Sequence, residues 1–224
     1  MAETDFYALA VDGRERRVPT ISSNPAHLLW SRVVPADRAA RMADVLTGEA
    51  MFSGWGVRTL ARGQAVYNPL SYHNGTVWPH DCSIAALGMS RYGLRKQPLE
   101  IFTALFDAAQ HFRYYRLPEL FCGMSRSAGE FLVHYPVSCS PQAWASGALF
   151  MLLQAVLGLD ANAPAGRLHI ANPRLPSFVH RLNLLDMHVG RSRVSLRFVR
   201  EGARVHVDLI DIQGAPLRVQ IELD

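Results

Sequence analysis

The sequence predicts a mainly α-helical domain over residues 1–160 and a small antiparallel β-unit over residues 161–224. Apolar residues recur at helical spacing in several segments before residue 160. After the linker at 161–166, short runs alternate apolar and polar residues between glycine turns, and every Trp and Tyr precedes that linker. Such a change of pattern is typical of a helical domain that carries a β-module.

Proline and glycine mark the ends of the expected elements. Residues 5–12 read as an extended segment or strand, and Pro25 begins a short helix behind a Ser or Asn cap. Pro35 begins a second helix that ends at Gly48. Further helices are expected at 79–93, 94–115 and 140–159, the last capped by Ser140. In the tail, the clearest strands are 194–199, 203–210 and 217–223.

Composition excludes several classes of protein. The net charge is +4 over 224 residues and the arginines are scattered, whereas a nucleic-acid binder gathers them on one face. The three cysteines form no CxxC pair and the N-terminus has no signal-peptide pattern. No apolar run reaches the length of a membrane span. We therefore expect a soluble, cytoplasmic protein that binds neither nucleic acid nor membranes, in an oligomeric state that the sequence leaves open.

The most informative stretch is a loop over residues 53–81 that is rich in aromatic and hydrogen-bonding side chains. Its glycines and prolines interrupt regular structure, and a long ordered loop in a compact domain is usually functional. Flat rings beside imidazole, amide and carboxylate groups suit a sugar, which has apolar faces and a hydroxyl-bearing edge. The candidate binding residues of this loop are Trp55, Tyr72, His73, Asn74, Trp78, His80 and Asp81.

Glu119 is the carboxylate best placed for acid–base work. It lies among Leu117, Pro118, Leu120 and Phe121, and partial desolvation of a carboxylate suits general acid or base chemistry. A structural role, as a turn cap or a partner of a nearby arginine, is the alternative.

Each other candidate also has a structural alternative. Asp81 can serve simply to cap the helix that follows it, and His73 can order its own loop. The tryptophans can be core residues, although Trp144 and Gln142 at the start of the last helix can also face a cavity. No Cys/His spacing supports a metal site, and no phosphate loop, dinucleotide fingerprint or nucleophile elbow is present. We expect no metal and no cofactor.

Five strings taken together resemble one enzyme family: SNPAHLLW, FSGWGVRTL, YNPLSYHNGTVWPHD, RLPELFCG and YPVSCSPQAWASGALFMLLQA. In this order they resemble the C-terminal part of the bacterial amylo-α-1,6-glucosidases, which are related to glycogen debranching enzymes and to mannosylglycerate-hydrolase-like glycosidases. The resemblance covers most of residues 5–160. It implies a partial (α/α)6 toroid, of the six-hairpin glycosidase type, that binds an oligosaccharide or glucoside.

The resemblance also implies an inverting mechanism in which Glu119 is the general base. The resemblance further implies a sugar site lined by Trp55, Tyr72, His73, Asn74, Trp78, His80 and Gln142. The general acid would lie in an upstream segment, on a polypeptide that completes the barrel. The chain alone is then expected to be weakly active or inactive. Two alternatives remain: a non-catalytic carbohydrate-binding or regulatory remnant, and a degraded gene product with exposed core surface.

Overall fold

The computed structural model describes residue 1, residues 6–126 and residues 131–223. The chain divides into two compact units, Met1–Leu152 and Leu153–Asp224. None of the helices in the described part of the chain is both long and apolar enough to cross a bilayer.

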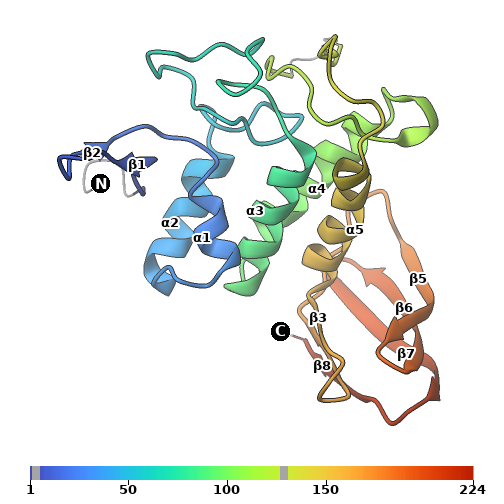
Figure 1. Cartoon of the computed structure of the whole chain (residues 1–224). Helices are drawn as coiled ribbons and strands as arrows, with labels where there is room; N and C mark the ends of the chain where they lie inside the picture. Colours follow the sequence, from blue (N-terminus) through green and yellow to red (C-terminus); the bar gives the residue numbers. More distant parts are fainter. Residues whose placement is uncertain (2–5, 127–130, 224) are drawn as a thin grey trace. The chain divides into compact units, whose positions relative to one another are not determined.

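The first unit is built on α-helices joined by loops (Figure 1). They are α1 (Ala26–Trp30), α2 (Ala36–Thr47), α3 (Pro79–Arg91) and α4 (Lys96–Ala109), and α5 (Ala143–Leu157) begins in this unit. A 3-10 turn, η1 (Arg113–Tyr115), follows α4, and β1 (Ala10–Val11) pairs with β2 (Arg17–Val18). Helix α3 is central, since it contacts both α1 and α4.

Two long loops lie at the same end of α3 and α4 (Figure 1). They are residues 48–78 and 116–142, and their described residues form isolated β-bridges instead of continuous strands. One bridge joins Val77 to Phe121, whose backbones exchange two hydrogen bonds of 2.9 and 3.0 Å. Both side chains are fully buried, so the two loops share one part of the core.

The second unit contains two three-stranded sheets. One has the order β3 (Leu159–Asn162), β4 (Arg167–Ala171), β8 (Arg218–Glu222), and β4 runs parallel to β8. The other is the antiparallel sheet of β5 (Arg181–Val189), β6 (Ser192–Glu201) and β7 (Arg204–Gly214). The three strands expected from alternation are β6, β7 and β8, but β8 pairs in parallel, so this unit is not purely antiparallel.

The expected mainly α, partial (α/α)6 toroid is wrong. Helices hold 29% of the chain and strands 26%, and the described residues contain five α-helices and three sheets. The physical reason is that loops occupy much of the segment before residue 143, and α1 spans only five residues. A double ring of long helices is therefore not formed.

Candidate functional site

The candidate site is a cavity of about 650 Å³ that lies entirely in the first unit. Its walls come from the N-terminal segment, from both long loops and from the first turns of α1, α3 and α5. The lining residues are Leu9, Ser22, Ser23, Asn24, His27, Thr59, Leu60, Tyr72, His73, Asn74, Trp78, His80, Asp81, Glu119 and Trp144.

The Val77–Phe121 pairing brings the two predicted parts of the site together. Trp78 directly follows Val77, and Glu119 lies two residues before Phe121. The paired backbones of Val77 and Phe121 are buried and doubly hydrogen-bonded. This pairing fixes the backbone from which the side chains of Trp78 and Glu119 extend. The backbone N–H of Glu119 also donates to the carbonyl of Cys139 at 2.8 Å.

A close approach between glycines holds the same loops together. A side chain on Gly123 would meet the carbonyl oxygen of Gly75 at 1.7 Å, so that position accepts glycine only. The Gly123 N–H donates to the carbonyl of Pro69 at 2.9 Å, which ties the two loops again. At Gly123, the second loop therefore packs directly against Pro69 and Gly75 of the first loop.

Trp78 is the centre of a ring cluster. Its ring lies 4.9 Å from that of Tyr72, 5.6 Å from His73, 5.8 Å from His80 and 6.4 Å from Trp144, measured between centroids. The indole Nε1–H donates to the Tyr72 carbonyl and to the Thr76 hydroxyl, at 3.1 and 3.0 Å, which fixes the ring. Trp78 is only 8% exposed, so it supports its neighbours and offers little surface of its own.

Trp144 offers the accessible ring. It is 48% exposed and its ring stacks on that of His80, with centroids 4.5 Å apart and planes 16° apart. Burial lowers the pKa of His80 from its ordinary value, and its Nδ1 atom is buried without a hydrogen-bond partner. An unpartnered buried nitrogen disfavours the doubly protonated ring. Both features favour the neutral imidazole of His80 over the imidazolium.

The cavity contains two carboxylates in different surroundings. Glu119, which is half-buried, accepts a hydrogen bond of 2.9 Å at Oε1 from the Tyr72 hydroxyl. This bond to the carboxylate raises the pKa of Tyr72, because the phenol is the required donor. Asp81 is instead paired with His27, Oδ1 to Nε2 at 3.0 Å, and this bond raises the pKa of His27.

Most of the residues that the sequence singled out line this one cavity, but two do not. Trp55 is 4% exposed, with the Arg126 guanidinium 4.3 Å above its ring and the His111 ring edge-on at 5.1 Å. Gln142 precedes α5 and its backbone N–H donates to the Leu117 carbonyl at 3.4 Å. Neither is a lining residue of the cavity.

One part of the cavity lining was missed by the sequence reasoning. It comes from residues 22–24 and 59–60, with His27 and Leu9 beside them. Small polar residues of this kind occur in every loop, and they reach the cavity only because the chain at 21–23 pairs with the chain at 59–61. The motif SNPAHLLW contains Asn24 and His27, and it was the one available signal.

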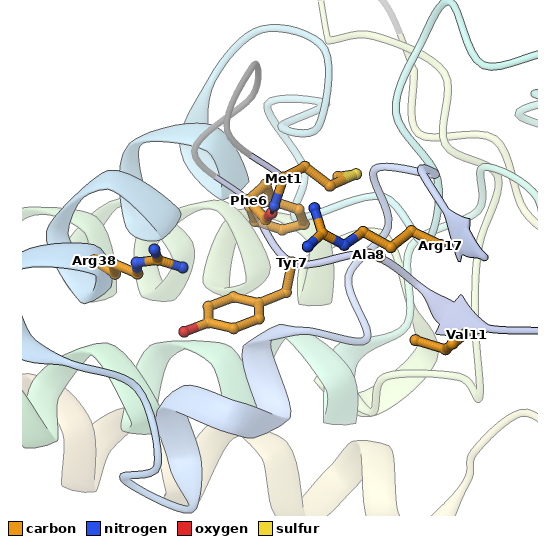
Figure 2. Close-up of a pocket in the computed structure, with 7 residues that line it drawn as sticks. All are labelled: Met1, Phe6, Tyr7, Ala8, Val11, Arg17 and Arg38. Atoms are coloured by element: carbon orange, nitrogen blue, oxygen red, sulfur yellow. Dashed lines mark hydrogen bonds between the residues drawn. The ribbon is translucent and has the colours of Figure 1, made fainter. Parts of the chain in front are cut away.

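A second cavity, of about 570 Å³, lies near β1 and β2 (Figure 2). It is lined by Met1, Phe6, Tyr7, Ala8, Val11, Arg17 and Arg38. The Arg38 guanidinium lies 5.9 Å from the centre of the Tyr7 ring. Its described lining residues include no carboxylate that could act as a general base. The Glu119 cavity is therefore the better candidate for chemistry.

Nothing in the described residues groups three or more side chains of the kind that hold a metal ion. No protein-family model matches the chain, and no curated protein is significantly similar to it.

Proposed function

We propose that the Glu119 cavity binds an α-glucoside or short oligosaccharide and that Glu119 is the general base of an inverting glycoside hydrolysis. The observation that carries this proposal is the Tyr72–Glu119 hydrogen bond inside a cavity lined by aromatic rings. The Trp144 ring is exposed for stacking on a pyranose face, and His73, Asn74 and His80 can hydrogen-bond its hydroxyl groups. The proposed compartment is the cytoplasm.

In this reaction a water molecule attacks the anomeric carbon while the bond to the leaving oxygen breaks. The Glu119 carboxylate takes the proton that the water loses, and the Tyr72 hydroxyl holds the carboxylate in position. The leaving oxygen needs a proton from a general acid. We place that acid on another polypeptide, because Asp81, the other carboxylate of the cavity, is already bound to His27.

The engagement of Asp81 also favours a second candidate, a carbohydrate-binding protein without turnover. Such a protein keeps the rings and the hydroxyl-binding groups and has no proton donor for the leaving group. The two candidate functions share the binding site and differ only in whether the bound sugar is hydrolysed.

A substrate that needs no general acid separates the candidates. Fluoride leaves without protonation, so a site with only the base should hydrolyse α-glucosyl fluoride, which a fluoride electrode measures. Glu119→Gln is expected to lower this rate at least about 100-fold, the usual contribution of general base catalysis. Glu100→Gln is the control, since Glu100 is a half-exposed residue of α4 that pairs with Lys96 at 3.8 Å, outside the cavity.

Hydrolysis by Glu119→Gln at the wild-type rate would refute the base assignment. Calorimetric binding of isomaltose without hydrolysis of the fluoride would establish the second candidate. Trp144→Ala should weaken isomaltose binding about tenfold, which corresponds to the loss of a ring contact of about 1.4 kcal/mol. Trp30→Ala is the control, because Trp30 is also partly exposed (41%) but lies outside the cavity. If neither sugar binds, both candidates are wrong.

A further inference from the structure

The cavity near β1 and β2 has a positive lining and lies apart from the Glu119 cavity. Arg17, in β2, and Arg38, in the first turn of α2, both line it. Figure 2 shows their guanidinium groups directed towards each other from opposite sides. The described lining residues include no carboxylate, and none of them also lines the Glu119 cavity.

Carboxylates close to these two arginines in the sequence are bound elsewhere or lie outside the cavity. Asp12 accepts a hydrogen bond of 2.8 Å from Nε of Arg16, and Asp37 accepts one of 3.0 Å from Arg41. Each bond lowers the pKa of the aspartate, so both carboxylates are ionised and already engaged. Glu15, in the turn between β1 and β2, is exposed and does not line the cavity. Within the described chain, the two cavity arginines therefore have no carboxylate partner.

Regular backbone structure holds both arginines in place. Arg17 is paired with Val11 in the register of β1 and β2, so the two side chains leave the same face of this ribbon, and Val11 also lines the cavity. Arg38 directly precedes Ala39, a fully buried residue of α2. The arginine side chains themselves are exposed, so a ligand can reach them from solvent.

Aromatic side chains add apolar surface beside the two charges. Phe6 is fully buried and Tyr7 is half-buried, and both line the cavity. The Arg38 guanidinium lies 5.9 Å from the centre of the Tyr7 ring, within the range of a cation–π contact. A volume of about 570 Å³ is within the range of cavities that bind small organic ligands. The cavity can therefore take a flat ring as well as an anionic group.

The charge of the expected ligand follows from the chemistry of arginine. A guanidinium group binds carboxylate or phosphate oxygens through two parallel hydrogen bonds, which makes it selective for these anions. Two such groups on one cavity favour a ligand with two negative charges over a ligand with one. A phosphate monoester carries close to two negative charges at neutral pH.

We propose that the cavity lined by β1, β2 and α2 binds a small, doubly charged anion that carries a flat ring, such as an aryl phosphate. Arg17 and Arg38 hold the anionic group, and Tyr7 contacts the ring. The inference does not rest on the proposed glycoside hydrolysis, because the two cavities share no described lining residue.

Calorimetry on the full chain with three probes tests this site: phenyl phosphate, inorganic phosphate and the uncharged benzyl alcohol. At about pH 7.5, where the phosphate monoester is doubly charged, we expect phenyl phosphate to bind at least about tenfold more tightly than the other two. Arg17→Gln and Arg38→Gln should each weaken phenyl phosphate binding about three- to tenfold, as expected for a lost charge-assisted hydrogen bond at an exposed site. Both variants should melt near the wild-type temperature, because neither breaks an ion pair of the described chain.

Arg14→Gln is the matched control. Arg14 is an exposed arginine of the turn between β1 and β2 and does not line the cavity, so its loss changes the net charge equally and should leave the affinity unchanged. Tyr7→Leu tests the ring contact. It should weaken phenyl phosphate binding about tenfold and leave inorganic phosphate binding unchanged.

Three results would overturn the proposal. They are no binding of phenyl phosphate, an unchanged affinity in Arg17→Gln and Arg38→Gln, and an equal loss in Arg14→Gln, which would show a general attraction of anions to a basic chain. Binding to Glu3→Gln/Asp5→Asn but not to the wild type would also overturn it, because carboxylates of the chain would then be the anions that the arginines bind. Both of these acidic residues lie outside the described part of the chain.

Discussion

Two histidines of the cavity have their protonation equilibria shifted in opposite directions. His27 gains a hydrogen bond to Asp81, which raises its pKa above the ordinary value of 6.5. His80 loses water on burial against its neighbouring rings, which lowers its pKa below the same value. Both residues are early in their helices, α1 and α3, and they face the same space.

These shifts predict a pH dependence with two separate windows. The contribution of His27 to stability is fully present below pH 6.5 and is lost as the pH rises through its raised folded pKa. For His80 the unfolded chain binds the proton more readily, so stability is lost as the pH falls below 6.5 towards the lowered folded pKa. Urea midpoints measured from pH 5 to 8 should show both losses.

The matched variants are His27→Gln and His80→Gln. His27→Gln should remove the decline above pH 6.5 and keep the decline below it, and His80→Gln should do the reverse. Asp81, Glu119 and His73 face the same cavity, so Asp81→Asn should reproduce the effect of His27→Gln. Identical pH profiles for wild type and both histidine variants would contradict the assignment.

At the scale of residues, the sequence could predict only those site residues whose types are uncommon in ordinary loops. Rings, imidazoles and carboxylates gathered near glycines and prolines mark a site, and those from Tyr72 to Asp81 line one cavity with Glu119. Trp55 shows the limit, because its ring is covered by Arg126, which lies 71 positions later in the sequence. Ser22 is the converse case: it lines the cavity but was not predicted, because only its long-range pairing with Leu60 places it there.

At the scale of elements, the positions of proline and glycine were the most reliable indicators of helix boundaries. Helix α2 lies between Pro35 and Gly48, and α3 begins at Pro79, as expected. Helix α5 begins at Ala143, later than Ser140 and Pro141 suggested. The parallel pairing of β4 with β8 was not predictable from alternation, which gives the faces of a strand but not its partner.

The loops that carry the site depend on a buried arginine. Arg58 is completely buried, and its guanidinium donates to the Gly123 carbonyl at 2.8 Å and to the Ser125 hydroxyl at 2.9 Å. Longer bonds of 3.3 and 3.4 Å reach the carbonyls of Glu49 and Ala50. Burial lowers the pKa of Arg58, but the guanidinium still satisfies three carbonyl groups of two loops.

Arg58→Met is expected to lower the free energy of unfolding by about 2–4 kcal/mol. The variant relieves the desolvation of a charge, but it leaves three carbonyl groups without their donor, each worth about 1–3 kcal/mol when buried. We expect the second effect to dominate, because Arg58 already meets its hydrogen-bonding requirement in the folded chain. Urea unfolding measures the change.

The control for this substitution is Arg62→Met, four residues later. Arg62 is about half exposed and pairs with Glu49 at 3.2 Å, so its loss should change the free energy of unfolding by less than about 1 kcal/mol. Equal effects of the two variants would show that Arg58 does not hold the loops.

At the scale of the whole molecule, the arrangement of the site residues is separable from the fold that we expected to carry them. The strings from which we predicted a glycosidase family include most of the residues around the cavity, yet the toroid that this prediction implied is not formed by the described residues. The motifs lie mainly in loops whose geometry is fixed locally by the Val77–Phe121 pairing and the Gly75–Gly123 contact. Such a local frame needs only the helices that support it, here α3 and its neighbours.

The division into two units predicts that ligand binding and β-unit stability are independent. Every residue that lines the cavity belongs to Met1–Leu152. The boundary falls within α5, so loss of the β-unit would release only the residues of that helix after Leu152. Saturating isomaltose should therefore raise the unfolding temperature of the first unit alone, because a ligand stabilises only the state that binds it.

Scanning calorimetry of two core variants checks this. Phe198→Ala in β6 removes a fully buried ring and should destabilise the β-unit by about 3–5 kcal/mol, leaving the isomaltose affinity unchanged. Leu105→Ala in α4, also fully buried, should lower the other transition by about 2–5 kcal/mol. A single transition that isomaltose shifts as a whole would show that the two units unfold together and that stability passes between them through α5.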